Sequence, residues 1–180
     1  PNANGIPIHN FSDSFTGGAN SILWLKINEG TTPNIVYAND RVEMLARDDG
    51  TAYPRLISKN RYNLYSSSII VNIPTVGTPA TTQSAEFRLN AGTDADATGN
   101  SLKWIVTTPN SNNVVKLYHK TTLAINVYSN THNYMKWYKI AESGGVLTWS
   151  TSTDSSTWVT ANTITLSTYP GLNIKNVRVE

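Results

Sequence analysis

The chain has 180 residues, which suits one all-β domain and is long enough to bury a hydrophobic core without a disulfide or a metal. Thr, Asn and Ser supply 61 residues, charged residues supply 14% and Cys is absent, so hydroxyls and amides dominate the expected surface. The net charge of +2 comes from scattered cations, which argues against nucleic-acid binding, and no apolar run reaches the roughly 18 residues that a membrane span needs.

Runs of β-type residues follow one another along the chain, with turn residues between them and no convincing helical periodicity. So many short strands exceed a small immunoglobulin-like sandwich and favour two larger antiparallel sheets. In chain order, the predicted strands are Ser21–Ile27, Asn34–Tyr37, Arg41–Ala46, Arg55–Ser58, Tyr62–Leu64, Ser68–Ile73, Ala85–Asn90, Ser101–Thr107, Val114–His119, Thr122–Tyr128, Met135–Glu142, Val146–Thr151, Thr157–Ala161 and Lys175–Glu180.

Turn and loop residues separate these strands. Ser143-Gly144-Gly145, between two apolar-aromatic runs, predicts a hairpin, and residues 93–100 predict a longer loop. Residues 74–84 are the most linker-like stretch, but each half of the chain alone has too little apolar sequence for a core. We therefore predict a single domain over residues 1–180. Because the sequence begins without an initiator Met or a signal peptide, we expect it to be part of a longer protein.

Alternation along the strands assigns side chains to faces. In Ala85–Asn90 the odd-numbered residues are apolar and the even-numbered ones are polar. In Ser101–Thr107, Leu102, Trp104 and Val106 share one face. Several strands thus combine one apolar face with one mixed face, as expected of a sandwich whose outer surface can hold a ligand.

The most specific pattern in the sequence covers residues 130–158. Its residues are His132, then Trp137-Tyr138-Lys139-Ile140, then Glu142-Ser143-Gly144-Gly145, then Trp149-Ser150-Thr151-Ser152-Thr153-Asp154-Ser155-Ser156-Thr157-Trp158. This pattern resembles that of concanavalin A-like, laminin G-like sandwich domains in bacterial exported and phage tail proteins. Phe11-Ser12-Asp13-Ser14-Phe15, with Trp24 shortly after, resembles the start of the same domains.

The resemblance implies an all-β fold, a two-sheet antiparallel β-sandwich of the concanavalin A-like jelly-roll type, and often glycan binding. It also implies an extracellular, cell-surface or virion-tail location within a multidomain parent. Two positions depart from the pattern: Lys139 replaces an Arg, and Ser155 replaces a Gly. The second change predicts a turn that either does without positive φ at Ser155 or tolerates strain there.

Catalysis finds little support in the sequence. Glycoside hydrolysis, known among concanavalin A-like proteins, needs two carboxylates about 5–10 Å apart. None of the five Glu residues has a second carboxylate two or four positions away on its own strand, although a cross-strand pair stays open. The chain also lacks Cys and a Gly-x-Ser-x-Gly motif, and its three His residues are far apart in the sequence. We therefore predict that the protein is not an enzyme.

Residues 93–100 have Asp94 and Asp96 at alternate positions before Gly99, so the loop is a candidate site for a structural calcium ion. No Glu closes it as in an EF-hand, and a solvated loop is the competing interpretation. Asp13, near the N-terminal turn with Gly17 and Gly18, is a second candidate for a structural ion. No cofactor is predicted.

The aromatic residues favour carbohydrate binding, because sugar rings stack on flat apolar rings while neighbouring polar groups bind the hydroxyls. The four Trp residues within the family pattern, Trp24, Trp137, Trp149 and Trp158, are expected to be structural, with Trp158 filling the core behind the Asp154 turn. By face and neighbourhood, the candidate ligand-binding residues are Tyr53, Arg55, Arg88, Trp104, His119, Tyr128 and His132.

Three functions follow as hypotheses. The first is a non-catalytic, lectin-like module that binds a neutral glycan. The second is a structural or adhesive sandwich that docks onto a protein, and the third is a glycoside hydrolase. The surface discriminates between them: exposed coplanar aromatics favour the first, a flat hydroxyl-rich face the second, and two facing carboxylates the third.

Overall fold

The computed structural model describes residues 5–18, 20, 22–27, 35–38, 41–44, 54–73, 83–91, 100–108, 113–119, 122–129 and 135–180. Most of the described chain is extended, with short 3-10 helices at η1 (Ile8–Asn10) and η3 (Leu166–Thr168). In this part of the chain no helix is long and apolar enough to cross a membrane.

The strands follow the predicted order, with one addition, β1, that the sequence analysis did not predict. They are β1 Ile6–Pro7, β2 Trp24–Ile27, β3 Ile35–Ala38, β4 Arg41–Met44, β5 Arg55–Ser58, β6 Tyr62–Asn63, β7 Ser68–Asn72, β8 Gln83–Asn90, β9 Ser101–Thr108, β10 Asn113–His119, β11 Thr122–Ser129, β12 Trp137–Ser143, β13 Val146–Ser152, β14 Val159–Thr165 and β15 Arg178–Val179.

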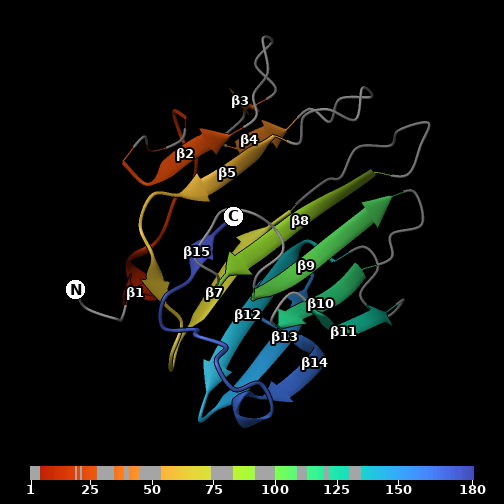
Figure 1. Cartoon of the computed structure of the whole chain (residues 1–180). Helices are drawn as coiled ribbons and strands as arrows, with labels where there is room; N and C mark the ends of the chain where they lie inside the picture. The colour runs from red at the N-terminus through yellow and green to blue at the C-terminus, as the bar shows by residue number, and fades with distance from the viewer. Residues whose placement is uncertain are drawn as a thin grey trace.

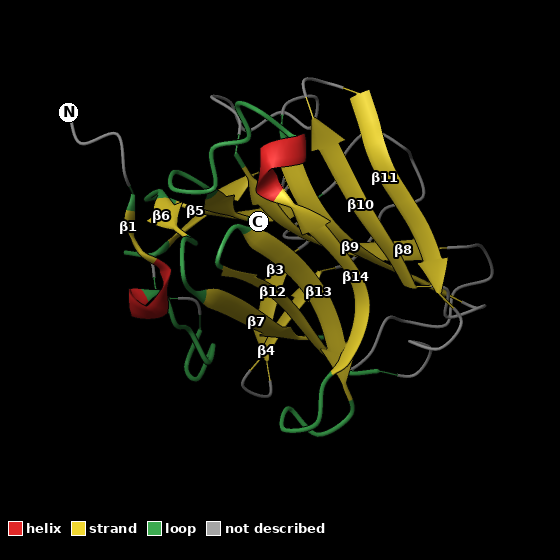
Figure 2. Ribbon diagram, turned by 90° about the horizontal axis from the view of Figure 1, so that it is seen from below, coloured by secondary structure: helices red, strands yellow, loops and turns green. Residues whose placement is uncertain are grey.

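Two antiparallel sheets form the body of the molecule. One has the strand order β11-β10-β9-β8-β15 and the other β14-β13-β12-β7. Figures 1 and 2 show them as two layers, with β8 to β11 in one and β7, β12 and β13 in the other. The pairs β2–β5, β3–β4 and β1–β6 form smaller sheets. This architecture confirms the predicted all-β, two-sheet antiparallel sandwich of the jelly-roll type.

The hydrophobic core lies between the two sheets. Trp104 from β9 and Trp149 from β13 are both fully buried there. Trp104 also packs edge-on against Tyr138, with ring centroids 5.4 Å apart, and its indole Nε1 donates a hydrogen bond to the carbonyl of Lys139. Because β12 contributes Tyr138 and Lys139, these contacts join the two layers directly.

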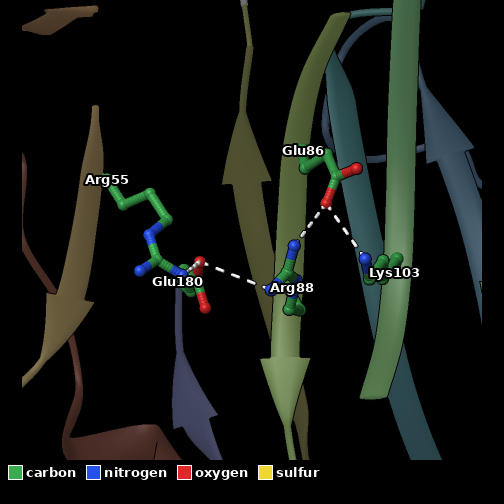
Figure 3. A network of polar contacts seen from close by, with 5 residues as sticks. All are labelled: Arg55, Glu86, Arg88, Lys103 and Glu180. Carbon is green, nitrogen blue, oxygen red and sulfur yellow. Dashed lines mark hydrogen bonds and ion pairs between the residues drawn. The ribbon is translucent and has the colours of Figure 1, made fainter. Parts of the chain in front are cut away.

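The last strand of the structure connects the five-stranded sheet to β5. The backbone of Glu180 exchanges two hydrogen bonds with Arg88 of β8, at 2.8 and 2.9 Å. On its other side, the amide of Val179 donates to Ser58 Oγ of β5 at 3.0 Å. As a result β5, β15, β8 and β9 lie side by side (Figure 3).

Several strand bounds differ from prediction, and two of these differences have a local reason. The strand predicted from Thr157 begins at Val159, because Asp154 Oδ1 accepts the amide hydrogens of Ser156 and Thr157 and holds them in a turn. The strand predicted from Ser21 begins at Trp24, because the carbonyl of Asn20 accepts hydrogen bonds from the amides at the end of the preceding turn.

The Asp154 turn resolves the two alternatives for Ser155 and corrects the role of Trp158. Ser155 adopts φ +65°, so the turn keeps a left-handed conformation without glycine. Trp158 does not fill the core. It is only partly buried, and the Lys139 ammonium lies 4.0 Å from the centre of its ring.

Candidate functional site

The outer face of the five-stranded sheet carries a row of charged side chains. Alternation sends Phe87 and Leu89 into the core, so Arg88 projects to the opposite face. The strand register then places Glu180 and Lys103 on either side of Arg88, with Lys116 beyond Lys103. The row therefore crosses β15, β8, β9 and β10.

Glu180 lies between two guanidinium groups. Its Oε1 is 3.3 Å from Nη1 of Arg55 and 3.5 Å from Nη1 of Arg88. Arg55 reaches this carboxylate from β5, and Arg88 reaches it from β8 (Figure 3). The side chains of Glu180 and Arg88 are 7% and 9% exposed, so the contact is largely shielded from water.

Glu86 forms the second half of the network. Its Oε2 accepts hydrogen bonds from Arg88 at 2.6 Å and from Lys103 Nζ at 3.2 Å. Its other oxygen points away from both cations (Figure 3). Lys103 Nζ also lies 5.0 Å from the centre of the Tyr118 ring. Arg88 thus contacts both carboxylates, and Lys103 is held between a carboxylate and an aromatic ring.

The network shifts the titration of two of its members. Burial acts to raise the pKa of the Glu86 carboxyl, but the hydrogen bond and charge of Arg88 and the charge of Lys103 outweigh burial, and the pKa falls below its ordinary value. Burial lowers the pKa of the Lys103 ammonium, and the nearby Glu86 offsets this only in part. At neutral pH Glu86 is therefore ionised and serves as an acceptor.

Several buried polar atoms of this face have no hydrogen-bond partner among the described residues. On Arg88 these are Nε and Nη1, and on Glu180 the atom is Oε2. Ser101 Oγ and Arg178 Nε, on the neighbouring strands β9 and β15, are also buried and have no hydrogen-bond partner among the described residues. Buried groups of this kind usually have partners, so these atoms keep hydrogen-bonding capacity that the described residues do not use.

The two carboxylates also bear on catalysis. Glu180 lies opposite Arg88, and Glu86 is two residues from Arg88 on the same face, so the two Glu residues are diagonal neighbours on adjacent strands. The Cα atoms of such neighbours lie roughly 7–8 Å apart, and glycoside hydrolases hold their two carboxylates about 5–10 Å apart. A general acid needs a raised pKa, however, and the pKa of Glu86 is lowered, so Glu86 does not suit that role.

The structure places the predicted ligand-binding residues in different surroundings. Arg55 and Arg88 come together on Glu180. Trp104 is corrected: it is 0% exposed and belongs to the core, so its ring offers no face to a sugar. His119 lies near Tyr169 and Pro170, with a ring nitrogen 3.0 Å from the Pro170 carbonyl, and it takes no part in the charged network.

The other predicted site residues lie outside what the structure describes. Tyr53, His132, Asp94 and Asp96 fall outside the described residues, and only the backbone of Tyr128 is described, in β11. Within the described part of the chain, no group of three or more His, Asp or Glu side chains could hold a metal ion. The calcium loop and the patch at Tyr128 and His132 therefore stay predictions.

Sequence reasoning missed Glu86, Lys103 and Glu180. Glu86 alternates with Arg88 on the polar face of one predicted strand, so its position beside Arg88 could have been inferred. The pairing of β8 with β9, and with the last residues of the chain, brings in the other two. That pairing joins segments distant in sequence, and no local pattern signals it.

Partly buried aromatics occur on the other sheet. Trp137 and Lys139 alternate with buried residues along β12 and face away from the core. Ile70, opposite Lys139 on β7, is 46% exposed. The Lys139 ammonium lies 4.0 Å from the centre of the Trp158 ring and so covers one face of that ring.

No protein-family model matches the chain, and no curated protein sequence is significantly similar to it. Among solved structures, the chain is similar to the Bacillus licheniformis β-glucanase, with a TM-score of 0.57 and 10% sequence identity. The match covers 99% of this chain and 85% of that chain. At this identity the likeness shows the shared fold alone, and it agrees with the concanavalin A-like jelly roll implied by residues 130–158.

The comparison contradicts the prediction that the protein is not an enzyme. The β-glucanase is an enzyme built on the same fold, so the lack of a recognisable motif in this chain is no ground for excluding catalysis. The prediction rested on a search for carboxylate pairs within single strands. Glu86 and Glu180 instead meet across two strands, through Arg88.

Proposed function

We propose that this domain binds carbohydrate on the outer face of the five-stranded sheet. The observation that carries the proposal is the network of Arg55, Arg88, Lys103, Glu86 and Glu180, in which buried donors and acceptors keep unused hydrogen-bonding capacity. Carboxylates and guanidinium groups fixed on rigid strands are suited to bind the hydroxyls of a sugar. The shared fold with a β-glucanase supports the same class of ligand.

In this proposal each member of the network has a separate task. Arg55, with 21% of its side chain exposed, and Glu86, with 34% exposed, reach solvent and contact the sugar first. Arg88 and Lys103 are buried and hold the two carboxylates in position. Tyr118, beside Lys103, is only partly buried and offers the nearest aromatic ring.

The test is a glycan array and a set of insoluble polysaccharides, probed with the wild-type domain and two matched variants. Arg55→Gln removes a guanidinium from the network, and Arg41→Gln removes one from the exposed Arg41–Glu43 pair on β4. We expect selective binding that Arg55→Gln weakens and Arg41→Gln leaves unchanged. If both variants lose binding, or if both bind as the wild type does, the glycan binds elsewhere on the domain. Absence of any glycan binding would overturn the proposal and favour a protein-docking role.

A second candidate function is glycoside hydrolysis, and a specific observation favours it. One guanidinium, that of Arg88, contacts both Glu86 and Glu180, which keeps two carboxylates close together on adjacent strands, as glycoside hydrolysis requires. The test is the release of reducing ends from every polysaccharide that binds. Release that Glu86→Gln and Glu180→Gln each abolish would establish catalysis at this pair, whereas release that survives both variants would exclude the pair.

Location and context are part of the proposal. The weakly charged surface rich in Thr, Asn and Ser fits an extracellular, cell-surface or virion-tail domain within a larger parent protein. Repetition of the domain in such a parent would strengthen a modest affinity per site through avidity.

A further inference from the structure

Among the described residues, the outer face of the five-stranded sheet carries more cations than carboxylates. Five cationic side chains lie on it or reach it: Arg55, Arg88, Lys103, Lys116 and Arg178. Among the described residues, their carboxylate partners on this face are Glu86 and Glu180. The whole chain has a net charge of only +2, so the described part of this face concentrates positive charge.

Glu180 is poorly satisfied as an ion-pair partner. Its contacts with Arg55 and Arg88, at 3.3 and 3.5 Å, exceed the roughly 2.7–2.9 Å of a strong charge-assisted hydrogen bond. By contrast, Glu86 lies 2.6 Å from Arg88. The second oxygen of Glu180 is buried and has no hydrogen-bond partner in the described part of the chain. A carboxylate held in this way is readily replaced by one with better geometry.

The guanidinium of Arg88 has donor groups that the described residues do not use. Its Nη2 is engaged by Glu86, while Nε and Nη1 have no hydrogen-bond partner among the described residues. These two groups lie on different edges of the guanidinium, with Cδ between them, so each can donate only to a separate acceptor oxygen. An acid group that replaced Glu180 would therefore have Nη1 of Arg88 and Nη1 of Arg55 as its nearest donors.

From this geometry we infer that the ligand is an acidic glycan, one whose sugars carry carboxylates, and that Glu180 occupies the position of the sugar carboxylate when no ligand is bound. This inference rests on the proposed function and narrows its ligand class, and it differs from the sequence-based prediction of a neutral glycan. The sugar carboxylate binds between Arg55 and Arg88, while Glu86 keeps Lys103 and the far side of Arg88 in place.

The experiment is isothermal titration calorimetry with three probes: an oligogalacturonate, a neutral galactose oligomer of the same length, and dextran sulfate. We expect the oligogalacturonate to bind about tenfold more tightly than the neutral oligomer, as one additional charged hydrogen-bonding group provides. Its affinity falls as salt is raised, because the attraction is between charges. Dextran sulfate binds more weakly than the oligogalacturonate, because a tetrahedral sulfate does not fit the place of the planar Glu180 carboxylate between the two guanidinium groups.

Glu180→Gln gives the sharpest result, because it removes the competing carboxylate but preserves the shape of the side chain. We expect it to tighten oligogalacturonate binding several-fold, about as much as the loss of one competing charged contact allows. The matched control is Glu43→Gln, which removes an ion-paired carboxylate from β4 and leaves binding unchanged. Arg55→Gln should weaken oligogalacturonate binding, and this variant tests the inference even if Glu180→Gln does not fold.

The outcomes separate this inference from the proposed function. If the neutral oligomer binds as tightly as the acidic one, and Arg55→Gln weakens both, the face binds glycans but the acidic preference is wrong. If Glu180→Gln folds and weakens oligogalacturonate binding, Glu180 is a ligand contact and its role as a substitute for the sugar carboxylate is overturned. If neither oligomer binds, the inference and the proposed function fail together.

Discussion

At the scale of single residues, the structure contains side chains whose position depends on one or two contacts. Lys103 is a buried cation, 7% exposed, whose carboxylate partner is Glu86. Ser155 holds a left-handed backbone conformation that a glycine would adopt without strain. Each of these residues gives a prediction about stability that is independent of any ligand.

Glu86→Gln should destabilise the domain by about 1–2 kcal/mol at pH 7, because Lys103 and Arg88 lose a charged acceptor while staying buried. The cost is kept moderate by the partial exposure of Glu86. Urea unfolding measures the change. Glu43→Gln, in the exposed pair with Arg41, is the control and should shift stability by less than about 0.5 kcal/mol. An equal loss in both variants would show that the network adds no stability of its own.

The same variant tests the pKa of Glu86. Because this pKa is lower in the folded protein than its ordinary value of 4.5, the unfolded chain binds the proton first as the pH falls. The carboxyl therefore stabilises the fold fully above pH 4.5, and this contribution is lost as the pH falls through 4.5 to the lowered pKa. The stability difference between wild type and Glu86→Gln should shrink over that range, and a difference that is constant with pH would contradict the assignment.

Ser155→Gly should stabilise the domain by about 0.5–1 kcal/mol, because glycine adopts positive φ without the steric cost that a side chain incurs. This net value already allows for the greater conformational entropy that glycine gives to the unfolded chain. Thermal unfolding measures the shift. Ser156→Gly, at the next position of the turn, is the control and should be neutral or destabilising. A destabilised Ser155→Gly would mean that the Ser155 side chain contributes more than its strain costs.

At the scale of elements, one carboxylate holds the β12–β13 hairpin against the turn before β7. Glu142 is 2% exposed; one of its oxygens accepts the amide hydrogen of Gly145 at 2.7 Å, and the other accepts that of Ser66. The amide of Glu142 also donates to the carbonyl of Ser67. The Glu-x-Gly-Gly pattern of the sequence thus has a structural role, because it joins the hairpin to the strand beside it.

Glu142→Ala should therefore destabilise the domain by about 2–4 kcal/mol, since two backbone N–H groups lose their acceptor together. Urea unfolding again measures the change, and hydrogen exchange should show the amides of Ser66 and Gly145 losing protection first. Ser143→Ala, on the exposed side of the same hairpin, is the control and should be nearly neutral. A neutral Glu142→Ala would show that this link is dispensable.

The elements also show what the sequence could predict. Strands with clear alternation, such as β8 and β9, were found within one or two residues of their predicted bounds. The same alternation puts Trp104 beside Leu102 in the core, so its nomination as a ligand residue conflicted with its own strand pattern. Side-chain hydrogen bonds that end a strand, as at Asp154, were harder to foresee because their partners depend on the folded turn.

At the scale of the whole molecule, the pairing of distant strands creates the candidate site. Arg55 and Arg88 were predicted as ligand residues, but the contact that unites them depends on Glu180, 125 residues after Arg55. A local pattern carries no information about such a pairing. The sandwich was predictable from many short strands and from residues 130–158, whereas the neighbours of β15 were not.

The central claim, that the outer face of the five-stranded sheet binds a glycan, is tested most directly by NMR. Backbone amide shifts of the labelled domain would be recorded while the best-binding oligosaccharide from the array is titrated in. The account predicts that the largest perturbations fall at Arg55, Arg88 and Lys103 and their strand neighbours. Perturbations centred instead on Trp137 and Lys139, on the outer face of the other sheet, would contradict it.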